Sequence, residues 1–476
     1  MSAPPAGLAV LDVLGPGQRG EVARLGEAFA AAGERLYLVG GIVRDVMLER
    51  ALPADLDFAT SARPERTQAI VAPLEPAGLY DVGERFGTIG VVFDIDDERM
   101  LVEITTFRSE QYAEGSRHPE VTYGESIEDD LSRRDFTVNA LAIDVADGAL
   151  IDPFGGEGDI ALGVLRAVGD ADERFAEDPL RLLRAARFVA QLGFRVDAAT
   201  EAAMARQAAA LATISRERVL AELTKLLLGD YADHGLHALL ESGLLTVAMP
   251  ELRPLADTAL GPPGVHREKD LWDHITRVVV QTPARPAVRW AALLHDAAKP
   301  LTRGVDAAGE VSFHGHERVG ADLATRLLRR LKADKALAAR VRRLVELHGR
   351  PQTYDAGWTD SAVRRLALEA GDALDDLLDL AAADVTSARE HRRRAAAARV
   401  AGLRAHIDRL EAEQALAELQ SPLDGNELMA LFDRPPGRWI AEVKDHLREL
   451  VIDGELGSAD KATAERIARE IVEGMG

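Results

Sequence analysis

Apolar positions follow two different patterns along the 476-residue chain. Between residues 36 and 165, apolar runs typical of strands alternate with short helical stretches; the runs are LYLVG, TIGVVFDI, MLVEITTF and NALAIDV. They predict a small domain built around one sheet. From about residue 166 onward Ala, Leu, Arg and Glu dominate, so we expect one helix after another. The predicted fold class is α+β, with a small mixed-sheet head followed by helical regions.

Composition narrows the class of protein. Hydrophobic residues make up 47% of the chain and charged residues 29%, which is typical of a soluble globular protein. No apolar run reaches the length of a membrane span, and the N-terminus lacks the basic region of a secretory signal. There are no cysteines, which excludes disulfides and thiolate metal sites. We expect a cytoplasmic protein of two to four domains.

The net charge of −22 is unevenly distributed. Residues 1–165 carry 13 Lys and Arg against 30 Asp and Glu, a net charge of −17. Residues 166–250 carry 10 against 12, and the remainder 34 against 37. Because nucleic acid is an anion, a binding surface for RNA is expected mainly on the later regions.

The stretch LYLVGGIVRDVMLERALPADLDF, residues 36–58, combines several candidate functional groups. It predicts a strand, a glycine turn, a helix start and a second strand that carries Asp55 and Asp57. Residues two apart on a strand point to the same face, so these carboxylates can share one or two Mg²⁺ ions. Gly40 and Gly41 leave backbone N–H groups open to a phosphate, and Arg44 can bind the same phosphates. The alternative is a pair of exposed aspartates without a ligand.

The pattern GGxVRD followed by DxD resembles the class II nucleotidyltransferases, which comprise CCA-adding tRNA nucleotidyltransferases and bacterial poly(A) polymerases. The resemblance implies that Glu103 in MLVEITTFR is a third catalytic carboxylate. It also implies a flexible loop over residues 108–125. LSRRDFTVNALA is similar to the RRDFTxNA element of the family, which assigns three residues to the nucleotide pocket: Arg134, Asp135 and Asn139.

The segment EDPLRLLRAARF, residues 177–188, predicts a helix in which four polar residues recur every three positions: Asp178, Arg181, Arg184 and Arg187. It resembles the EDxxR element of the family. That implies a protein template, in which Asp178 accepts from an exocyclic amine while Arg181 donates to a ring nitrogen or carbonyl oxygen of CTP or ATP. The alternative is a helix with surface ion pairs. ISRERVLAEL also resembles a family element, and Arg216, Glu217 and Arg218 are assigned a structural role.

A histidine and aspartate pattern follows between residues 266 and 384, and its order resembles the HD phosphohydrolase superfamily. The resemblance implies four core ligands of a divalent metal, Mn, Ni, Co, Mg or Fe: His274, His295, Asp296 and Asp384. His316 and His348 would complete a second site or bind phosphate, and Lys299 would contact phosphate.

These resemblances cover four predicted domains: a nucleotidyltransferase head (20–165), a helical neck (166–260), an HD domain (261–400) and a helical tail (401–476). They imply a CCA-adding tRNA nucleotidyltransferase that uses tRNA, CTP, ATP and Mg²⁺. The alternatives are a poly(A) polymerase, an HD phosphohydrolase with a nucleotide-binding head, and a non-catalytic RNA-binding protein. The sequence leaves the oligomeric state open.

Overall fold

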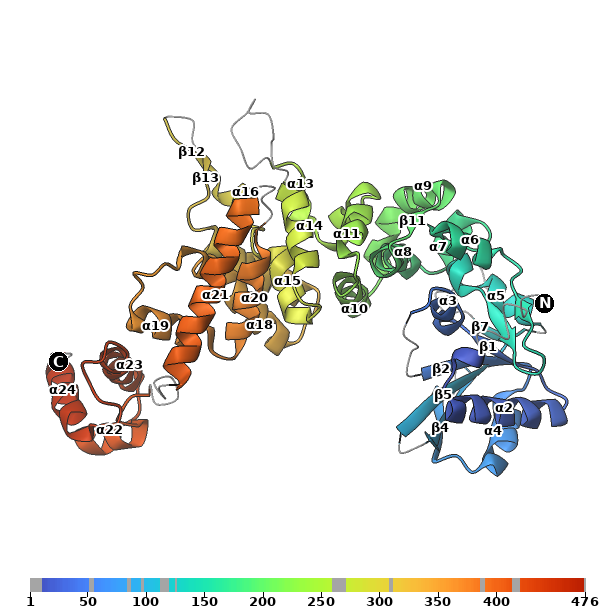
Figure 1. The fold of residues 1–476 in the computed structure, drawn as a ribbon, viewed down its shortest axis with the longest axis horizontal. Helices are drawn as coiled ribbons and strands as arrows, with labels where there is room; N and C mark the ends of the chain where they lie inside the picture. The colour runs from blue at the N-terminus through green and yellow to red at the C-terminus, as the bar shows by residue number, and fades with distance from the viewer. Residues whose placement is uncertain are drawn as a thin grey trace. The chain divides into compact units, whose positions relative to one another are not determined.

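The computed structural model describes residues 11–50, 55–83, 87–95, 98–111, 120–124, 126–258, 271–307, 311–385, 390–412 and 420–474. The chain divides into two compact units, residues 1–250 and 251–476, whose elements are labelled in Figure 1. The first unit contains a mixed sheet and helices, and the second is largely helical, so the predicted α+β class is confirmed. The four predicted domain boundaries stay predictions.

The sheet of the first unit has seven strands in the order β3-β4-β5-β2-β1-β8-β9. Their bounds are β1 Leu36–Val39, β2 Asp55–Thr60, β3 Gly78–Gly83, β4 Thr88–Ile95, β5 Glu98–Thr106, β8 Ala142–Asp144 and β9 Leu150–Ile151. Neighbouring strands are antiparallel, except that β2 and β5 are parallel. The parallel pair arises because the chain leaves β2 through helix α4 and the β3–β4 hairpin before it returns as β5.

Side chains alternate between the two faces of the sheet. Tyr37, Val39 and Ala59 form one buried cluster with residues of helix α5 (Ile127–Ser132), while Leu38 and Phe58 are buried on the opposite face. Helices α2 (Pro16–Ala31) and α4 (Pro64–Val71) lie side by side against the sheet (Figure 1). At the start of β2 every second residue is exposed, which leaves a polar patch on one face of the sheet beside the buried core.

The segment predicted as a loop at residues 108–125 contains two strands. β6 (Arg108–Gln111) pairs antiparallel with β7 (Glu120–Tyr123). Residues 112–119 and 125 lie outside the described part of the chain. The sequence lacks a clear two-residue alternation here, so the pairing of the two ends was not predictable from the pattern.

The rest of the first unit consists of helices α3 Gly41–Met47, α6 Gly156–Leu162, α7 Ala171–Glu177, α8 Leu180–Leu192, α9 Ala198–Gln207, α10 Arg216–Leu227, α11 Ala232–Glu241 and α12 Leu244–Ala248. Helix α8 packs against α10 and α11. Gly235 allows α11 to approach closely, because a Cβ there would lie 2.6 Å from Ala190 Cβ and 2.7 Å from the carbonyl oxygen of Ala186. A two-residue parallel ladder joins β10 (Val164–Leu165) to β11 (Arg195–Val196).

The second unit contains helices α13 Arg253–Ala256, α14 Leu271–Gln281, α15 Pro286–Leu294, α16 Lys299–Thr302, α17 His316–Arg330, α18 Lys335–Leu347, α19 Asp360–Ala370, α20 Leu374–Ala383 and α21 Glu390–Ala412. Strands β12 (Gly304–Val305) and β13 (Val311–Ser312) form a short ladder. Three further helices, α22 Gly425–Phe432, α23 Arg438–Ile452 and α24 Lys461–Gly474, share a core around Leu428, Trp439 and Val443. None of the helices in the described ranges has the length and apolar character that a bilayer span requires.

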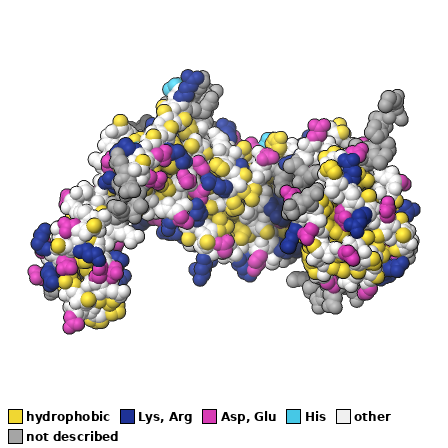
Figure 2. Space-filling view, turned by 60° about the horizontal axis from the view of Figure 1, so that its bottom comes forward, with side chains coloured by type: hydrophobic (Ala, Val, Ile, Leu, Met, Phe, Trp, Pro, Cys, Tyr) yellow, Lys and Arg dark blue, Asp and Glu magenta, His cyan; other side chains and the backbone are white. Residues whose placement is uncertain are grey.

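Basic and acidic side chains are interspersed on the face seen in Figure 2. The excess of acidic residues in the first third of the sequence therefore does not give that face one uniform sign. Local groups of arginine, rather than the net charge of a region, decide where an anion can bind.

Candidate active site and candidate metal centre

The glycine turn lies where β1 passes into helix α3. Gly40 has φ 84° and ψ −151°, a conformation that side chains disfavour. A Cβ at this position would also lie 3.2 Å from Asp57 Oδ2. Helix α3 begins at Gly41, as predicted, and places Arg44 in its first turn, where the side chain is buried. The turn is thus compact enough to bring the backbone next to the aspartate.

Three carboxylates share the polar patch where β2 and β5 lie side by side. Asp55 and Asp57 are exposed on β2 and separated by the buried Leu56, so both point to one face. In the parallel register Asp57 lies directly beside Glu103 on β5, which alternates with buried neighbours in the same way. Register between strands therefore places Glu103 with the two aspartates, which alternation along one strand could not decide.

The environment of Asp57 favours a bound cation. Although the residue is accessible to solvent, nearby protein atoms exclude enough water to raise the pKa of its carboxyl, and the negative charge of Glu103 raises it further. Arg134 opposes the shift, and Asp55 adds to it. Carboxylates that repel one another in this way are stabilised in their charged form when a cation lies between them.

A chain of hydrogen bonds joins the glycine turn to helix α8. Arg44 donates from Nη1 to Asn139 Oδ1 at 2.5 Å, and Asn139 donates from Nδ2 to Asp135 Oδ1 at 3.0 Å. Asp135 Oδ2 in turn accepts from Arg184 Nε at 2.6 Å. Burial disfavours the charged carboxylate, but Arg184 and the bond from Asn139 hold the pKa of Asp135 below its usual value. Three predicted pocket residues are thus joined to the neck arginine.

Asp178 does not lie on the same helix as the arginines, contrary to the sequence prediction. Helix α7 ends at Glu177, Asp178 is extended (φ −138°, ψ 98°), and α8 begins at Leu180. The side chain accepts from the backbone N–H of Leu180 at 3.1 Å and pairs with Arg218 Nη2 at 3.1 Å. Aspartate competes for backbone N–H groups, which explains why the helix is interrupted here.

Arg181 is held by three bonds. Its Nη1 donates to Glu177 Oε2 at 2.6 Å and to the carbonyl oxygen of Arg174 at 3.0 Å. Its Nη2 donates to the carbonyl oxygen of Arg133 at 2.7 Å. These bonds fix the guanidinium against the segment that contains RRD and use three of its five N–H groups.

Together these groups line a pocket of about 650 Å³. All the predicted nucleotide-site residues except Asp55 and Glu103 line it; these two flank Asp57 on the sheet. Gly40, predicted with Gly41 to open the backbone to phosphate, lines it as well. The lining also includes residues that the sequence did not single out as ligands: Arg133, Leu180, Phe188, Gln191, Arg218 and Lys225. Arg218 was assigned a purely structural role, but it reaches the pocket through Asp178; the ISRERVLAEL motif was the signal for it. Arg187 lines the wall while paired with the buried Glu222 at 3.1 Å.

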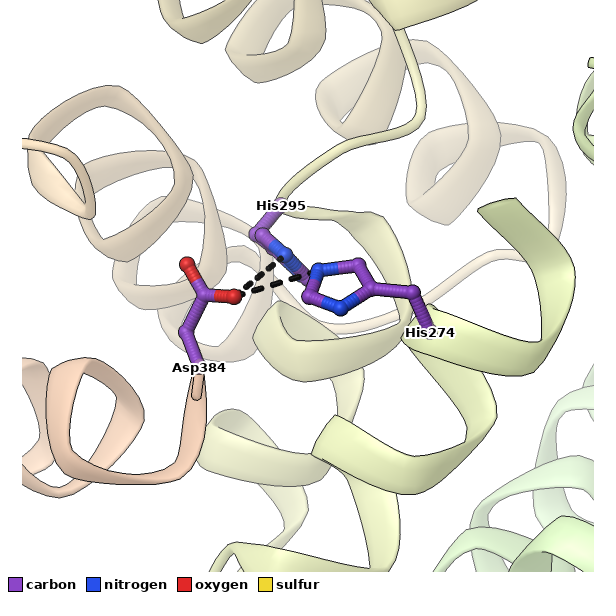
Figure 3. Close-up of side chains that lie close together, drawn as sticks. All are labelled: His274, His295 and Asp384. Atoms are coloured by element: carbon purple, nitrogen blue, oxygen red, sulfur yellow. Dashed lines mark ion pairs between the residues drawn. The ribbon is translucent and has the colours of Figure 1, made fainter. Parts of the chain in front are cut away.

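The second unit brings all six predicted metal ligands together. His274 Nε2 lies 3.1 Å from Asp384 Oδ1, and His295 Nε2 lies 3.6 Å from the same oxygen (Figure 3). Asp296 connects this triad to a second one. Its Oδ2 lies 3.3 Å from both of these histidine nitrogens, and its Oδ1 lies 3.4 Å from His316 Nε2 and 3.8 Å from His348 Nε2. The donor atoms form two adjacent groups that suit metal ions.

The backbone orients three of the histidines. Nδ1 of His295, His316 and His348 lies 2.7, 2.8 and 2.7 Å from the carbonyl oxygen three residues earlier. Because a carbonyl only accepts, each Nδ1 carries a proton, and each Nε2 is left to face the centre as a possible metal ligand. Within the described part of the chain, His295 Nε2 and Asp296 Oδ1 are buried without a hydrogen bond. A metal ion would satisfy both atoms.

The charges of the centre are strongly coupled. Burial disfavours the imidazolium of His295, but Asp296 and Asp384 raise the pKa of this residue to about 10. Burial and the charge of His295 lower the pKa of His348 to about 4. His295 and His274 lower the pKa of Asp384 below its usual value despite its burial. Two carboxylates thus remain ionised inside a buried histidine cluster, where a divalent cation can replace the proton of His295.

Two further side chains touch the ligands. Lys299, predicted to contact phosphate, donates from Nζ to Asp296 Oδ2 at 2.6 Å. Gln352 on the 3₁₀ turn η5 (Pro351–Thr353) donates to Asp384 Oδ2. The sequence contains no signal for Gln352, because the contact joins residues 32 positions apart.

Three family profiles match the chain. They are described as "Poly A polymerase head domain" (residues 36–166), "Probable RNA and SrmB-binding site of polymerase A" (residues 193–255) and "HD domain" (residues 274–389). The matched ranges follow the order of the predicted head, neck and HD domain.

Two curated relatives match over most of their length. A CCA-adding enzyme of Geobacillus sp. (strain WCH70) is 33% identical over 89% of this chain and 90% of its own. An A-adding tRNA nucleotidyltransferase of Deinococcus radiodurans is 36% identical over 90% of this chain and 94% of its own. The crystal structure of the Bacillus stearothermophilus CCA-adding enzyme in complex with CTP is 28% identical, covers 97% of this chain and 100% of its own, and has a TM-score of 0.67. By this evidence the chain belongs to the class II CCA-adding enzyme and poly(A) polymerase family and carries an HD domain.

Proposed function

We propose that this protein is a CCA-adding tRNA nucleotidyltransferase, which adds C, C and A to the 3′ end of tRNA from CTP and ATP and releases pyrophosphate. The observation that carries the proposal is the shared pocket, in which a strand aspartate, a glycine turn and the Asp178–Arg181 pair face one space of about 650 Å³. An enzyme that acts on tRNA is also expected in the cytoplasm.

Asp55, Asp57 and Glu103 would hold Mg²⁺. The adjacent positions of Asp57 and Glu103 and the raised pKa of Asp57 support this assignment. Bound Mg²⁺ neutralises charge on the phosphates and activates the attacking oxygen. Glu103, exposed on β5 beside Asp57, would also accept the proton of the tRNA 3′ hydroxyl as that oxygen attacks the α-phosphate and pyrophosphate leaves.

The triphosphate would bind at the glycine turn, where Gly41 leaves the backbone open and Arg44 and Arg134 supply positive charge. Asp135 and Asn139 would contact the ribose hydroxyls. Since these residues form one bonded chain with Arg184, sugar binding and the position of the neck helix are expected to depend on each other.

The base would be read by Asp178 and Arg181. Arg181 keeps two N–H groups beyond its three bonds within the protein, and the Asp178 carboxylate has lone pairs beyond the two bonds it makes. A carboxylate acceptor next to an arginine donor matches CTP and ATP, which present an exocyclic amine beside a ring nitrogen. UTP and GTP present the reverse pattern.

The test uses tRNA that lacks its 3′ CCA, incubated with Mg²⁺ and with CTP alone, ATP alone or both. Addition of C, C and then A supports the proposal. Transfer of A alone, and only onto tRNA that already ends in CC, would assign the chain the activity named for the Deinococcus relative. Long A tails on any RNA would instead identify a poly(A) polymerase.

We also propose that the second unit is a metal-dependent phosphohydrolase or phosphodiesterase. His274, His295, Asp296 and Asp384 would hold one divalent ion (Mn, Ni, Co, Mg or Fe). Asp296 would also be a ligand of a second ion, held by His316 and His348. Such ions activate water and polarise a phosphoryl oxygen. Lys299, bonded to Asp296, would contact a substrate phosphate bound to these ions.

Hydrolysis of p-nitrophenyl phosphate and bis(p-nitrophenyl) phosphate with each of the five metals tests the second proposal and separates monoesterase from diesterase activity. The matched variant is His274→Ala. The proposal fails if no metal supports turnover, or if the His274→Ala protein hydrolyses both substrates as fast as the native protein.

A further inference from the structure

A buried carboxylate outside the predicted sites holds two of the pocket arginines. Asp130 lies on helix α5 and is 1% exposed, whereas its neighbours Glu128 and Asp129 are exposed. An ionised carboxylate that is removed from water is strongly destabilising unless it is paired and hydrogen-bonded. Asp130 is therefore expected to have a specific set of partners.

Its partners are the adjacent arginines of the RRD segment. Asp130 Oδ1 accepts from Arg133 Nε at 3.1 Å and from Arg133 Nη2 at 2.7 Å, while Oδ2 accepts from Arg134 Nη2 at 3.2 Å. Residues three and four positions apart lie on one side of a helical turn, so one carboxylate reaches both guanidinium groups. Burial disfavours the charge, but the two arginines hold the pKa of Asp130 below its usual value.

Arg133 and Arg134, the two arginines that bond Asp130, also line the pocket of about 650 Å³. Arg134 donates from Nη1 to the carbonyl oxygen of Asn139 at 3.3 Å, and the same Nη1 lies 3.8 Å from the place of a Cβ on Gly40. The carbonyl oxygen of Arg133 accepts from Arg181. Asp130 thus sits behind groups that face the glycine turn and the base-reading arginine.

Asp130 also contacts the start of the β6–β7 hairpin. Its Oδ1 accepts from the backbone N–H of Arg108 at 3.4 Å, and Arg108 is the first residue of β6. The Arg108 side chain donates from Nη2 to Thr88 Oγ1 at 3.0 Å on the neighbouring sheet. One buried carboxylate therefore connects the hairpin to the two pocket arginines.

We propose that Asp130 is a positioning residue of the nucleotide site: it holds Arg133 and Arg134 toward the triphosphate and fixes them relative to strand β6. The inference rests on the proposed nucleotidyltransferase function. Without the carboxylate, two adjacent guanidinium groups repel each other and turn toward water. The nucleotide then has to order them again when it binds.

The test compares Asp130→Asn with Asp129→Asn, a matched control on the same helix whose carboxylate is exposed. Single additions of CTP and ATP to tRNA give KM and kcat separately, after thermal unfolding has shown that each variant is folded at the assay temperature. We expect KM for both nucleotides to rise about tenfold in Asp130→Asn, with a smaller change in kcat, and no change in Asp129→Asn. Unchanged KM in the folded Asp130→Asn protein would overturn the proposal.

A double-variant comparison separates positioning from a general loss of stability. If Asp130 acts through Arg134, Asp130→Asn changes KM much less in an Arg134→Gln background than in the native one. Independent, multiplicative effects in the two backgrounds would contradict the proposal. If Asp130→Asn does not fold, Asp130→Glu, which keeps the charge but moves it, is put through the same comparisons.

Titration of CTP without tRNA distinguishes failure of this inference from failure of the proposed function. A native protein that adds no nucleotide to tRNA would refute the function. The Kd for CTP in native, Asp130→Asn and Asp129→Asn proteins would still test the role of Asp130. Equal Kd values in all three would then overturn the inference.

Discussion

The pocket of the first unit and the histidine centre of the second unit differ in size and in how their side chains are held in place. The pocket is wide, lined by arginines, and many of these are paired with carboxylates of the same protein. The histidine centre is largely buried, and backbone carbonyls orient three of its imidazoles. A large anionic ligand can exchange protein partners for its own groups as it binds, whereas a small cation needs ligands that are already in place. The contrast leads to the following predictions.

The largest effect is expected from removing the strand carboxylates. Asp55→Ala with Asp57→Ala should lower nucleotide addition by about a thousandfold or more, because several kcal/mol of charge stabilisation by the metal are lost. Phosphoester hydrolysis by the second unit should stay at the native level. Nucleotide addition that survives the double substitution would refute the assignment of the metal site.

The converse substitution tests whether the two sites are independent. His295→Ala removes a fully buried Nε2 from the histidine centre, so metal affinity should fall by at least about a hundredfold, by isothermal titration with Mn²⁺ or Ni²⁺. Addition of C and A to tRNA should be unchanged. A parallel loss of nucleotide addition in a folded variant would show that the two sites do not act independently.

Gln352 offers a finer test of pre-oriented ligands. Gln352→Ala removes the donor to Asp384 Oδ2, so the carboxylate is free to turn, and metal affinity should fall about tenfold. Thr353→Ala, an exposed neighbour on the same turn, is the control. Equal Mn²⁺ affinities in the two variants would mean that packing alone holds Asp384.

The smallest effect is expected from the hydrogen bonds that join Asn139, Asp135 and Arg184 in the pocket, and it is an effect on how protein stability depends on pH. The pKa of Asp135 is lowered in the folded state, so its contribution to stability is complete above the usual aspartate pKa of about 3.9 and is lost as pH falls through the lower folded value. Asp135→Asn should therefore lower stability at pH 7 by about 1–3 kcal/mol and flatten the decline in Tm toward pH 3. Asp129→Asn should follow the native curve. A native-like curve for Asp135→Asn would show that the ion pair with Arg184 adds nothing to folding.

The two sites also differ in how well the sequence anticipated them. All six ligands of the histidine centre were predicted, and the structure brings all six together. Four of them are histidines, of which the chain has only 12, so their local motifs were easy to recognise. The pocket was predicted less completely. Arg218 was assigned a structural role only. Arg133, Gln191 and Lys225 were not singled out, because arginine, lysine and glutamine are common on helix surfaces.

Local patterns in the sequence determined the head with its glycine turn, the helical remainder, and the carboxylate and histidine chemistry. These features depend on side-chain type and on spacings of a few residues, which the chain encodes directly. Contacts between distant segments were decided only by the tertiary structure. The parallel register placed Glu103 beside Asp57, the break before Leu180 turned Asp178 into a partner of Arg218, and the fold brought Gln352 to Asp384. Strand register and long-range hydrogen bonds arise from packing over the whole fold, so no local pattern in this chain predicted them. The helix interruption itself has a local cause, because Asp178 precedes Pro179 and competes for a backbone N–H, but the partner of Asp178 depends on the fold.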